Sequence, residues 1–162
     1  LANMTLGSAG LAFVLSSNPN GHKLLGGIHQ TDSSGHSLCR GHGDIHELRM
    51  ETDTVELMRK GLVLSHVSWQ FFKNELGWDD TTPEHILTHQ ISRSHQEKFF
   101  QLLKLDEKKG YSNIEWLGNT GSAAAPLSLA MACEEGRIKK GDQAALLGIG
   151  SGISTLMLGL TW

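Results

Sequence analysis

Apolar residues recur every three to four positions between Thr52 and Leu76, which is the period of one face of an α-helix. Thr52 or Thr54 can cap the first turn, and Gly77 is typical of a helix end. The pattern therefore predicts a long amphipathic helix of roughly six turns. Its stripe of apolar and small residues consists of Val55, Leu57, Met58, Gly61, Leu62, Leu64, Ser65, Val67, Ser68, Phe71, Phe72 and Leu76.

Shorter apolar runs follow this helix and alternate with helical patterns. In chain order, we predict a strand over 86–89, a helix that opens near Ser92 or Ser94 and stops near Gly110, an extended piece over 113–117, a helix over 119–136 that Gly136 ends, and strands over 143–149 and 153–160. This order of elements predicts an α/β fold with a mixed sheet covered by helices.

The first thirty residues have the pattern of a hairpin. Residues 4–16 are mostly apolar and contain glycine, which favours a buried strand with a close backbone approach. Asn18-Pro19-Asn20-Gly21 is a strong turn signal, and residues 22–30 return as a second strand.

Residues 31–51 are polar, rich in glycine and histidine, and without a regular period, so we predict a loop. The histidines raise the question of a metal site, but their spacing matches no zinc motif. We therefore expect no metal and favour a role in lining or covering a binding site. The residues in question are His29, Asp32, His36, His42, Asp44, His46 and Glu47.

The stretch from Leu117 to Pro126 consists almost entirely of small residues around one amide, Asn119. Gly118 and Gly121 allow backbone angles that other residues resist, and Asn119 is a good helix N-cap. The sequence thus predicts an amide at the start of a helix that packs very closely. An N-cap without further function explains this stretch as well.

Composition narrows the class of protein. The 162 residues suit one domain, and 14 basic against 17 acidic side chains show neither a basic stripe for nucleic acid nor an acidic tail. The apolar runs are shorter than the ~20 residues of a membrane span, and no signal peptide is visible. Cys39 and Cys133 are far apart and form no paired motif, which favours a reducing, cytoplasmic location.

Three motifs together resemble a known family. They are the run Ile86–Gln90 that ends in His-Gln, the stretch Gly118–Pro126, and the glycine turn Gly148–Gly152. In this order and spacing they are similar to the C-terminal half of thiolase-fold condensing enzymes of the 3-oxoacyl-acyl-carrier-protein synthase III group. The resemblance implies a thiolase-like half-fold over 55–162, a connection over 31–54, and over 1–30 the last hairpin of the N-terminal half.

The resemblance also implies an acyltransferase that forms a carbon–carbon bond between two acyl thioesters. His89 and Asn119 match the catalytic His and Asn of the family, which hold the enolate oxygen with two neutral N–H donors. Gly150, Ser151 and Gly152 match the turn whose backbone N–H binds the acyl carbonyl. The strand that follows Ser151 argues against a serine-hydrolase elbow or a phosphate loop.

The nucleophilic cysteine of the family has no counterpart in this chain. Cys133 lies within a helical run and Cys39 within the polar loop. We therefore expect the nucleophile in an N-terminal half that is missing here, either in the same polypeptide or in a second chain. His85 and His95 compete with His89, but neither ends the predicted strand, so we interpret them as surface or supporting residues.

Two branches of the family remain open, together with a third possibility. Residues Thr5–Gly10, Leu147–Gly152 and Met157–Trp162 are more similar to enzymes that join two fatty acyl-CoA molecules head to head, without decarboxylation, in olefin biosynthesis. The other branch starts fatty-acid synthesis by decarboxylating malonyl-carrier protein, and Gln90–Arg93 departs from its carrier-contact motif. A non-catalytic pairing module is the third. By resemblance, we expect acyl-CoA or acyl-carrier protein as substrate, no cofactor, and a homodimer.

Overall fold

The computed structural model describes residues 5–44, 46–47 and 49–162. Its centre is a four-stranded sheet in the order β1-β6-β5-β4, in which β4 and β5 are parallel and the other neighbours antiparallel. The strands are β1 (Lys23–Thr31), β4 (His85–Thr88), β5 (Gln143–Gly150) and β6 (Ser154–Thr161). The predicted mixed sheet and its last two strands are confirmed.

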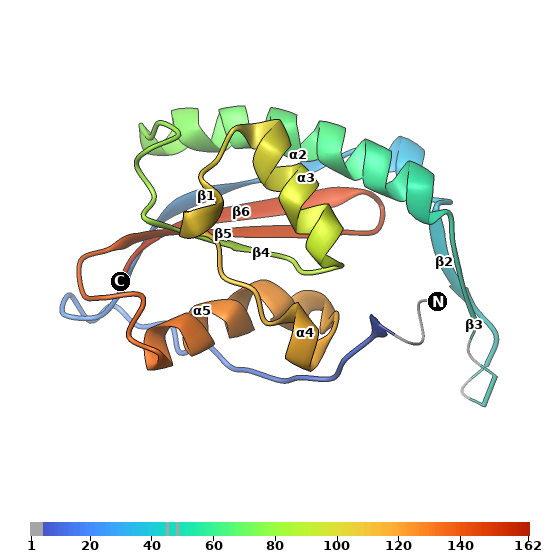
Figure 1. Cartoon of the computed structure of the whole chain (residues 1–162), viewed down its shortest axis with the longest axis horizontal. Helices are drawn as coiled ribbons and strands as arrows, with labels where there is room; N and C mark the ends of the chain where they lie inside the picture. Colours follow the sequence, from blue (N-terminus) through green and yellow to red (C-terminus); the bar gives the residue numbers. More distant parts are fainter. Residues whose placement is uncertain (1–4, 45, 48) are drawn as a thin grey trace.

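Helices cover both faces of this sheet (Figure 1). One face packs against α2 (Thr54–Leu76) and α3 (Arg93–Leu103), and the other against α5 (Ala124–Glu134), which follows the single-turn helix α4 (Ile114–Leu117). Short 3₁₀ turns complete the chain: η1 (Ser33–Gly35), η2 (Glu107–Lys109) and η3 (Gly121–Ala123). Among the described residues, no helix is long and apolar enough to cross a membrane.

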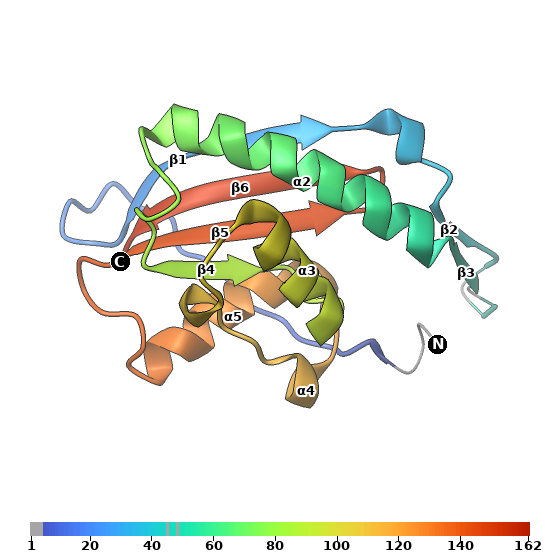
Figure 2. The ribbon, with the colours of Figure 1, turned by 45° about the horizontal axis from the view of Figure 1, so that its top comes forward.

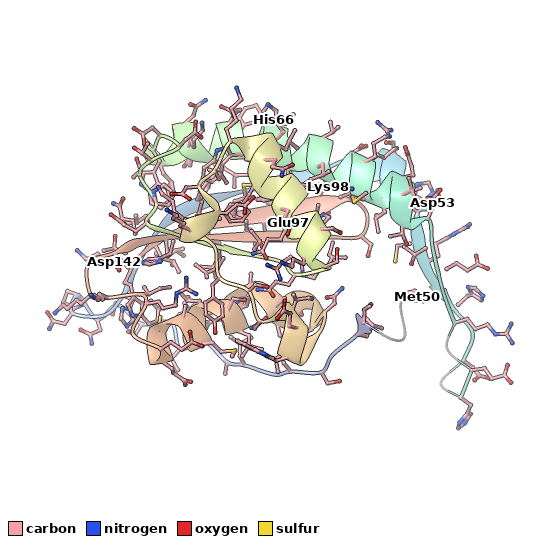
Figure 3. The ribbon with its side chains drawn as sticks, in the orientation of Figure 1. Met50, Asp53, His66, Glu97, Lys98 and Asp142 are labelled. Carbon is pink, nitrogen blue, oxygen red and sulfur yellow. The ribbon has the colours of Figure 1, made fainter. Side chains whose placement is uncertain are left out.

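Helix α2 confirms the long amphipathic helix. The carboxylate of Asp53 accepts a 3.0 Å hydrogen bond from the Glu56 N–H and caps the first turn, in place of the threonines that we expected. Figure 3 shows Asp53 at this end of the helix. Gly77 ends the helix with a φ of 65°, as predicted.

Helix α3 ends earlier than Gly110, at Leu103. Lys104 adopts a φ of 56°, and the Leu105 N–H donates to the Phe100 carbonyl at 2.9 Å. This bond is one of the pair that closes a Schellman motif, in which an apolar residue just past the helix packs back against it. Because Leu105 is buried in the core, its burial compensates for the strained angle of Lys104.

Three other sequence predictions are wrong. Residues 5–16 form no strand, and β1 pairs with β6 instead of with this segment; Met4 lies outside the described residues. The predicted loop contains a hairpin of β2 (Cys39–His42) and β3 (Arg49–Thr52), which projects away from the main sheet (Figures 1 and 2). The expected extended piece over 113–117 is α4, closed by hydrogen bonds onto the Asn113 and Ile114 carbonyls.

Candidate active site

His89 follows directly after β4. Its backbone N–H donates to the Leu147 carbonyl at 2.8 Å, which extends the pairing with β5 by one residue. Burial lowers the pKa of the His89 imidazole below its usual value, and a hydrogen bond to the Gly121 backbone opposes this shift. The ring is therefore neutral near pH 7, and a neutral imidazole offers one N–H donor.

Asn119 is held in place through its backbone. Its N–H donates to the Thr5 carbonyl at 2.7 Å, and its carbonyl accepts from the Gly7 N–H at 2.9 Å. The two segments approach so closely that a Cβ on Gly7 would overlap the carbonyl oxygen of Leu117. Gly118 supplies the positive φ of 67° that precedes this contact.

The side chain of Asn119 closes a turn and does not cap the main helix. Its Oδ1 accepts a 3.0 Å hydrogen bond from the Gly121 N–H, while η3 intervenes before α5 begins at Ala124. The expected N-cap is thus replaced by a local turn. Within the described chain the Asn119 Nδ2 has no hydrogen-bond partner, so its two N–H groups remain available to a ligand.

Gly121 connects the two predicted catalytic residues. Its backbone opposes the pKa shift that burial imposes on His89, and its N–H donates to the amide oxygen of Asn119. Both side chains are thereby placed at one loop, beside the carboxyl end of parallel strands, where α/β folds place their ligand groups.

The predicted glycine turn lies at the same end of the sheet, beyond β5 (Figure 2). Gly150 and Ser151 are exposed, and the next residue but one, Ile153, exchanges two 2.8 Å backbone hydrogen bonds with Asp32. In the described structure, no hydrogen bond joins Gly150, Ser151 or Gly152 to His89 or Asn119. The residues that share a cavity with His89 are instead Gly148 and Ile149.

Gln90 has a structural role that the sequence did not reveal. Only 2% of it is exposed, and its Nε2 donates to the Tyr111 carbonyl at 3.1 Å and to Ser128 Oγ at 2.7 Å. Its Oε1 accepts from the Asn113 N–H at 3.0 Å. One side chain thus joins the end of β4 to the α4 loop and to α5, and so positions the loop of Asn119 relative to His89.

The other two histidines near β4 have different surroundings. His85 pairs with Asp142 at 3.0 Å, at the opposite end of the strand (Figure 3 labels Asp142). His95 is 6% exposed and lines a cavity with His89, so of the two interpretations, surface or supporting residue, only the second fits it. Ser92 caps α3 through the His95 N–H and thereby orients His95 with Phe99 towards the core. Glu97 and Lys98 take the exposed face of α3 (Figure 3).

The two cysteines are free and half-buried. Burial, and next the charge of Glu134, raises the pKa of the Cys133 thiol, so little thiolate forms near neutral pH. Cys39 Sγ accepts a 3.5 Å hydrogen bond from Thr52 Oγ1 across the β2–β3 hairpin. In the part of the chain that the structure describes, no group of three or more His, Cys, Asp or Glu side chains could hold a metal ion.

Known proteins are similar to this chain in sequence. The chain is 32% identical over its whole length to an acyl-CoA:acyl-CoA alkyltransferase of Shewanella oneidensis, of which it covers 50%. It is 35% identical to the acyl-CoA:acyl-CoA alkyltransferase of Xanthomonas campestris, of which it covers 48%. The chain thus spans about half the length of these relatives.

Solved structures are similar to this chain as well. A crystal structure of Xanthomonas campestris OleA superimposes with a TM-score of 0.82 and 35% identity, covering 89% of this chain and 41% of that one. The family model for the C-terminal part of 3-oxoacyl-[acyl-carrier-protein (ACP)] synthase III matches residues 73–162, more than half of the chain. The chain therefore belongs to the family of the 3-oxoacyl-[acyl-carrier-protein] synthase III C-terminal domain, which has the thiolase fold that the sequence motifs suggested.

Proposed function

We propose that the complete protein is an acyltransferase that joins two acyl thioesters by Claisen condensation, and that His89 and Asn119 hold the enolate oxygen. The observation that supports this proposal most directly is the position of both residues beside Gly121, which places a neutral imidazole and a free amide at one loop. Two neutral N–H donors aimed at a developing oxyanion are an effective way to stabilise it.

In this reaction a cysteine thiolate first attacks the carbonyl of one acyl thioester, the carbon–sulfur bond to the carrier breaks, and the carrier leaves as its thiolate. A carbanion then forms beside the carbonyl of the second thioester, and its negative charge moves to the carbonyl oxygen, where the His89 and Asn119 N–H groups bind it. The carbanion attacks the cysteine-bound acyl carbon, a carbon–carbon bond forms, and the cysteine leaves as thiolate. The nucleophilic cysteine and the base that takes the α-proton belong, in this proposal, to the remainder of the polypeptide.

We place the substrates among fatty acyl-CoA thioesters and the reaction in the non-decarboxylative branch, with no cofactor. The two relatives matched over the whole chain are both named acyl-CoA:acyl-CoA alkyltransferase. The remaining half would cover the apolar side chains that residues 11–15 expose, where Val14 is 93% and Leu15 86% accessible. The assembled enzyme would be a cytoplasmic homodimer, and this can be checked by intact mass and gel filtration of the complete gene product.

The test uses His89→Ala and Asn119→Ala in the complete protein. Each variant should lose about 10²–10³-fold in condensation rate, the typical effect of removing one oxyanion donor, while acylation of the cysteine stays detectable. His85→Ala is the matched control, because its imidazole lies at the other end of β4 and pairs with Asp142. Unchanged product formation by His89→Ala would contradict the assignment.

Assays with different substrates distinguish the two branches of the family. Product from acyl-CoA alone supports the head-to-head reaction, and product that requires malonyl-carrier protein supports decarboxylative chain initiation instead. A complete wild-type protein that forms no product with either pair would overturn the enzyme proposal in favour of a pairing module.

A further inference from the structure

A small cavity lies beside His89. Its volume is about 10 Å³, and it is enclosed by the ends of β4 and β5, by α2 and by α3. Thr88 and His89 line it from β4, His95 and Phe99 from α3, and Ser65 from α2. Besides His89, three of these side chains are polar: Thr88, His95 and Ser65.

The hydroxyl of Thr88 is the unusual group in this cavity. Thr88 is 4% exposed, and its Oγ1 is buried without a hydrogen-bond partner. Among the described residues it is the sole buried side-chain nitrogen or oxygen atom of which this is true. A buried hydroxyl without a partner is destabilising, so its persistence needs an explanation.

His95 faces the same cavity and is also buried. In the described chain its ring nitrogens have no hydrogen bond to protein and, unlike Thr88 Oγ1, they are not fully buried; Phe99 and Leu147 line the same cavity. Burial lowers the pKa of His95 to about 4, and the nearby charges of His89 and Lys98 act in the same direction. The ring is therefore neutral near pH 7 and has one N–H donor and one acceptor nitrogen.

One water molecule would satisfy these groups. A site of roughly 10–15 Å³ with two to four polar partners is what a buried water requires. Here the Thr88 hydroxyl, the His95 ring and the Ser65 hydroxyl supply both donors and acceptors within such a volume. A larger ligand does not fit.

We propose that this cavity binds one water molecule, which joins the Thr88 hydroxyl to the His95 imidazole, and that His95 acts through it as a positioning residue for His89. His89 is then positioned by two neighbours, the Gly121 backbone and the hydrated cavity. The positioning role rests on the proposed function, whereas the water site does not depend on it.

A double-mutant cycle in thermal unfolding of the complete protein tests the water site. Thr88→Val keeps the shape of the side chain and removes the hydroxyl, and His95→Phe keeps a ring without nitrogen atoms. Each should lower Tm by about 2–4 °C. The double variant should lower it no further than the larger single effect, because the first substitution already releases the water.

Two results would contradict the proposed water site. The first is a Thr88→Val protein with unchanged or higher Tm, which is the expected effect of removing a hydroxyl that has no partner at all. The second is a double variant whose loss equals the sum of the single losses. Should His95→Phe fail to fold, Thr88→Val alone still decides between these results, and an ordered water in a crystal structure of the wild type gives an independent answer.

The positioning role is tested by kinetics. Thr88→Val should lower kcat for condensation about tenfold with little change in KM, as removal of a group that orients a functional histidine does elsewhere. Thr88→Ser, which restores the hydroxyl, should recover most of this loss, whereas a purely structural role predicts equal losses for Val and Ser. If wild type shows no condensation, the proposed function fails while the thermal cycle still decides the water site.

Discussion

The two faces of the four-stranded sheet are packed in different ways. On the α2 and α3 face the core consists of large aromatic side chains, among them Trp69, Phe72 and Phe100, each at most 1% exposed. On the α5 face the helix buries mostly small side chains, Ala124, Ala125, Ser128 and Ala132, with Leu129 as its large buried residue. The first face is thus held by large aromatic side chains, and the second by a smaller apolar cluster that includes Leu129 and by the hydrogen bonds of Gln90.

This difference explains the position of the candidate site. Small side chains on α5 let the loop around Gly121 lie close to the sheet, where its backbone opposes the pKa shift of His89. A helix with large side chains would keep the same loop further away. The α5 face, with its smaller side chains, is therefore the one that can present backbone and amide donors to a ligand. The aromatic side chains of α2 and α3 support β4 from the opposite face of the sheet.

The largest effect on stability should come from the aromatic face. Phe72→Ala removes a fully buried ring and leaves a cavity, so it should cost about 3–5 kcal/mol in the free energy of unfolding. Urea denaturation measures this. Phe71→Ala on the same helix is the control, because Phe71 is 54% exposed, and it should cost much less. Equal losses would show that the aromatic cluster does not hold this face.

His95 should make the free energy of unfolding depend on pH by about 3 kcal/mol. Its pKa is about 4 in the folded protein, against the ordinary value of 6.5 that applies to the unfolded chain. The unfolded chain takes up this proton at a higher pH than the folded one. Stability should therefore be complete above pH 6.5 and be lost as the pH falls from 6.5 to 4. His89, whose pKa is lowered as well, contributes with the same sign.

Urea titrations of wild type and His95→Leu between pH 7 and 4 measure this contribution. The variant should show a shallower loss over that interval, because one of the two buried histidines no longer titrates. Parallel curves for both proteins would contradict a neutral, buried His95. His85→Leu is a suitable control, since His85 is paired with Asp142 and only half-buried.

The smallest effect is expected on the face with small side chains. Ala132→Leu inserts a larger side chain beside Leu87 and Ala144 and should cost about 1–3 kcal/mol through overpacking. Ala130→Leu makes the same change at a half-buried position of α5 and should cost less. A neutral Ala132→Leu would mean that α5 can move away from the sheet without loss.

Elements with large apolar side chains were the ones that the sequence predicted well. The period of α2 and the runs of β5 and β6 are local properties, and the structure reproduces them within a few residues. Residues 5–16 have strand-like composition too, but a strand exists only where another strand pairs with it, and β6 pairs with β1 instead. The polar residues of β2 and β3 pair across a turn without any apolar period to indicate it.

The candidate site was accessible from sequence only in part. His89 and Asn119 were named by their resemblance to family motifs, and their roles remain predictions. The contacts of Gln90 with Tyr111, Asn113 and Ser128 bring together positions far apart in the chain, so no local pattern reports them. For His95 the sequence leaves a surface and a supporting position open, because one histidine on an otherwise polar helix start does not reveal which way the capped turn points.

The backbone contact between the first residues and the loop of Asn119 has a consequence for the order of folding. Leu6 and Asn119 pair as a single parallel bridge, flanked by hydrogen bonds from the Asn119 N–H to the Thr5 carbonyl and from the Gly7 N–H to the Asn119 carbonyl. Closing so long a stretch of chain carries a large entropic cost, which few local contacts offset. We therefore expect this bridge to form after the sheet and its helices, and on the ribosome the first residues must wait until the middle of the chain has emerged. The amide of Asn119 would then reach its final position late, when the rest of the domain is already folded.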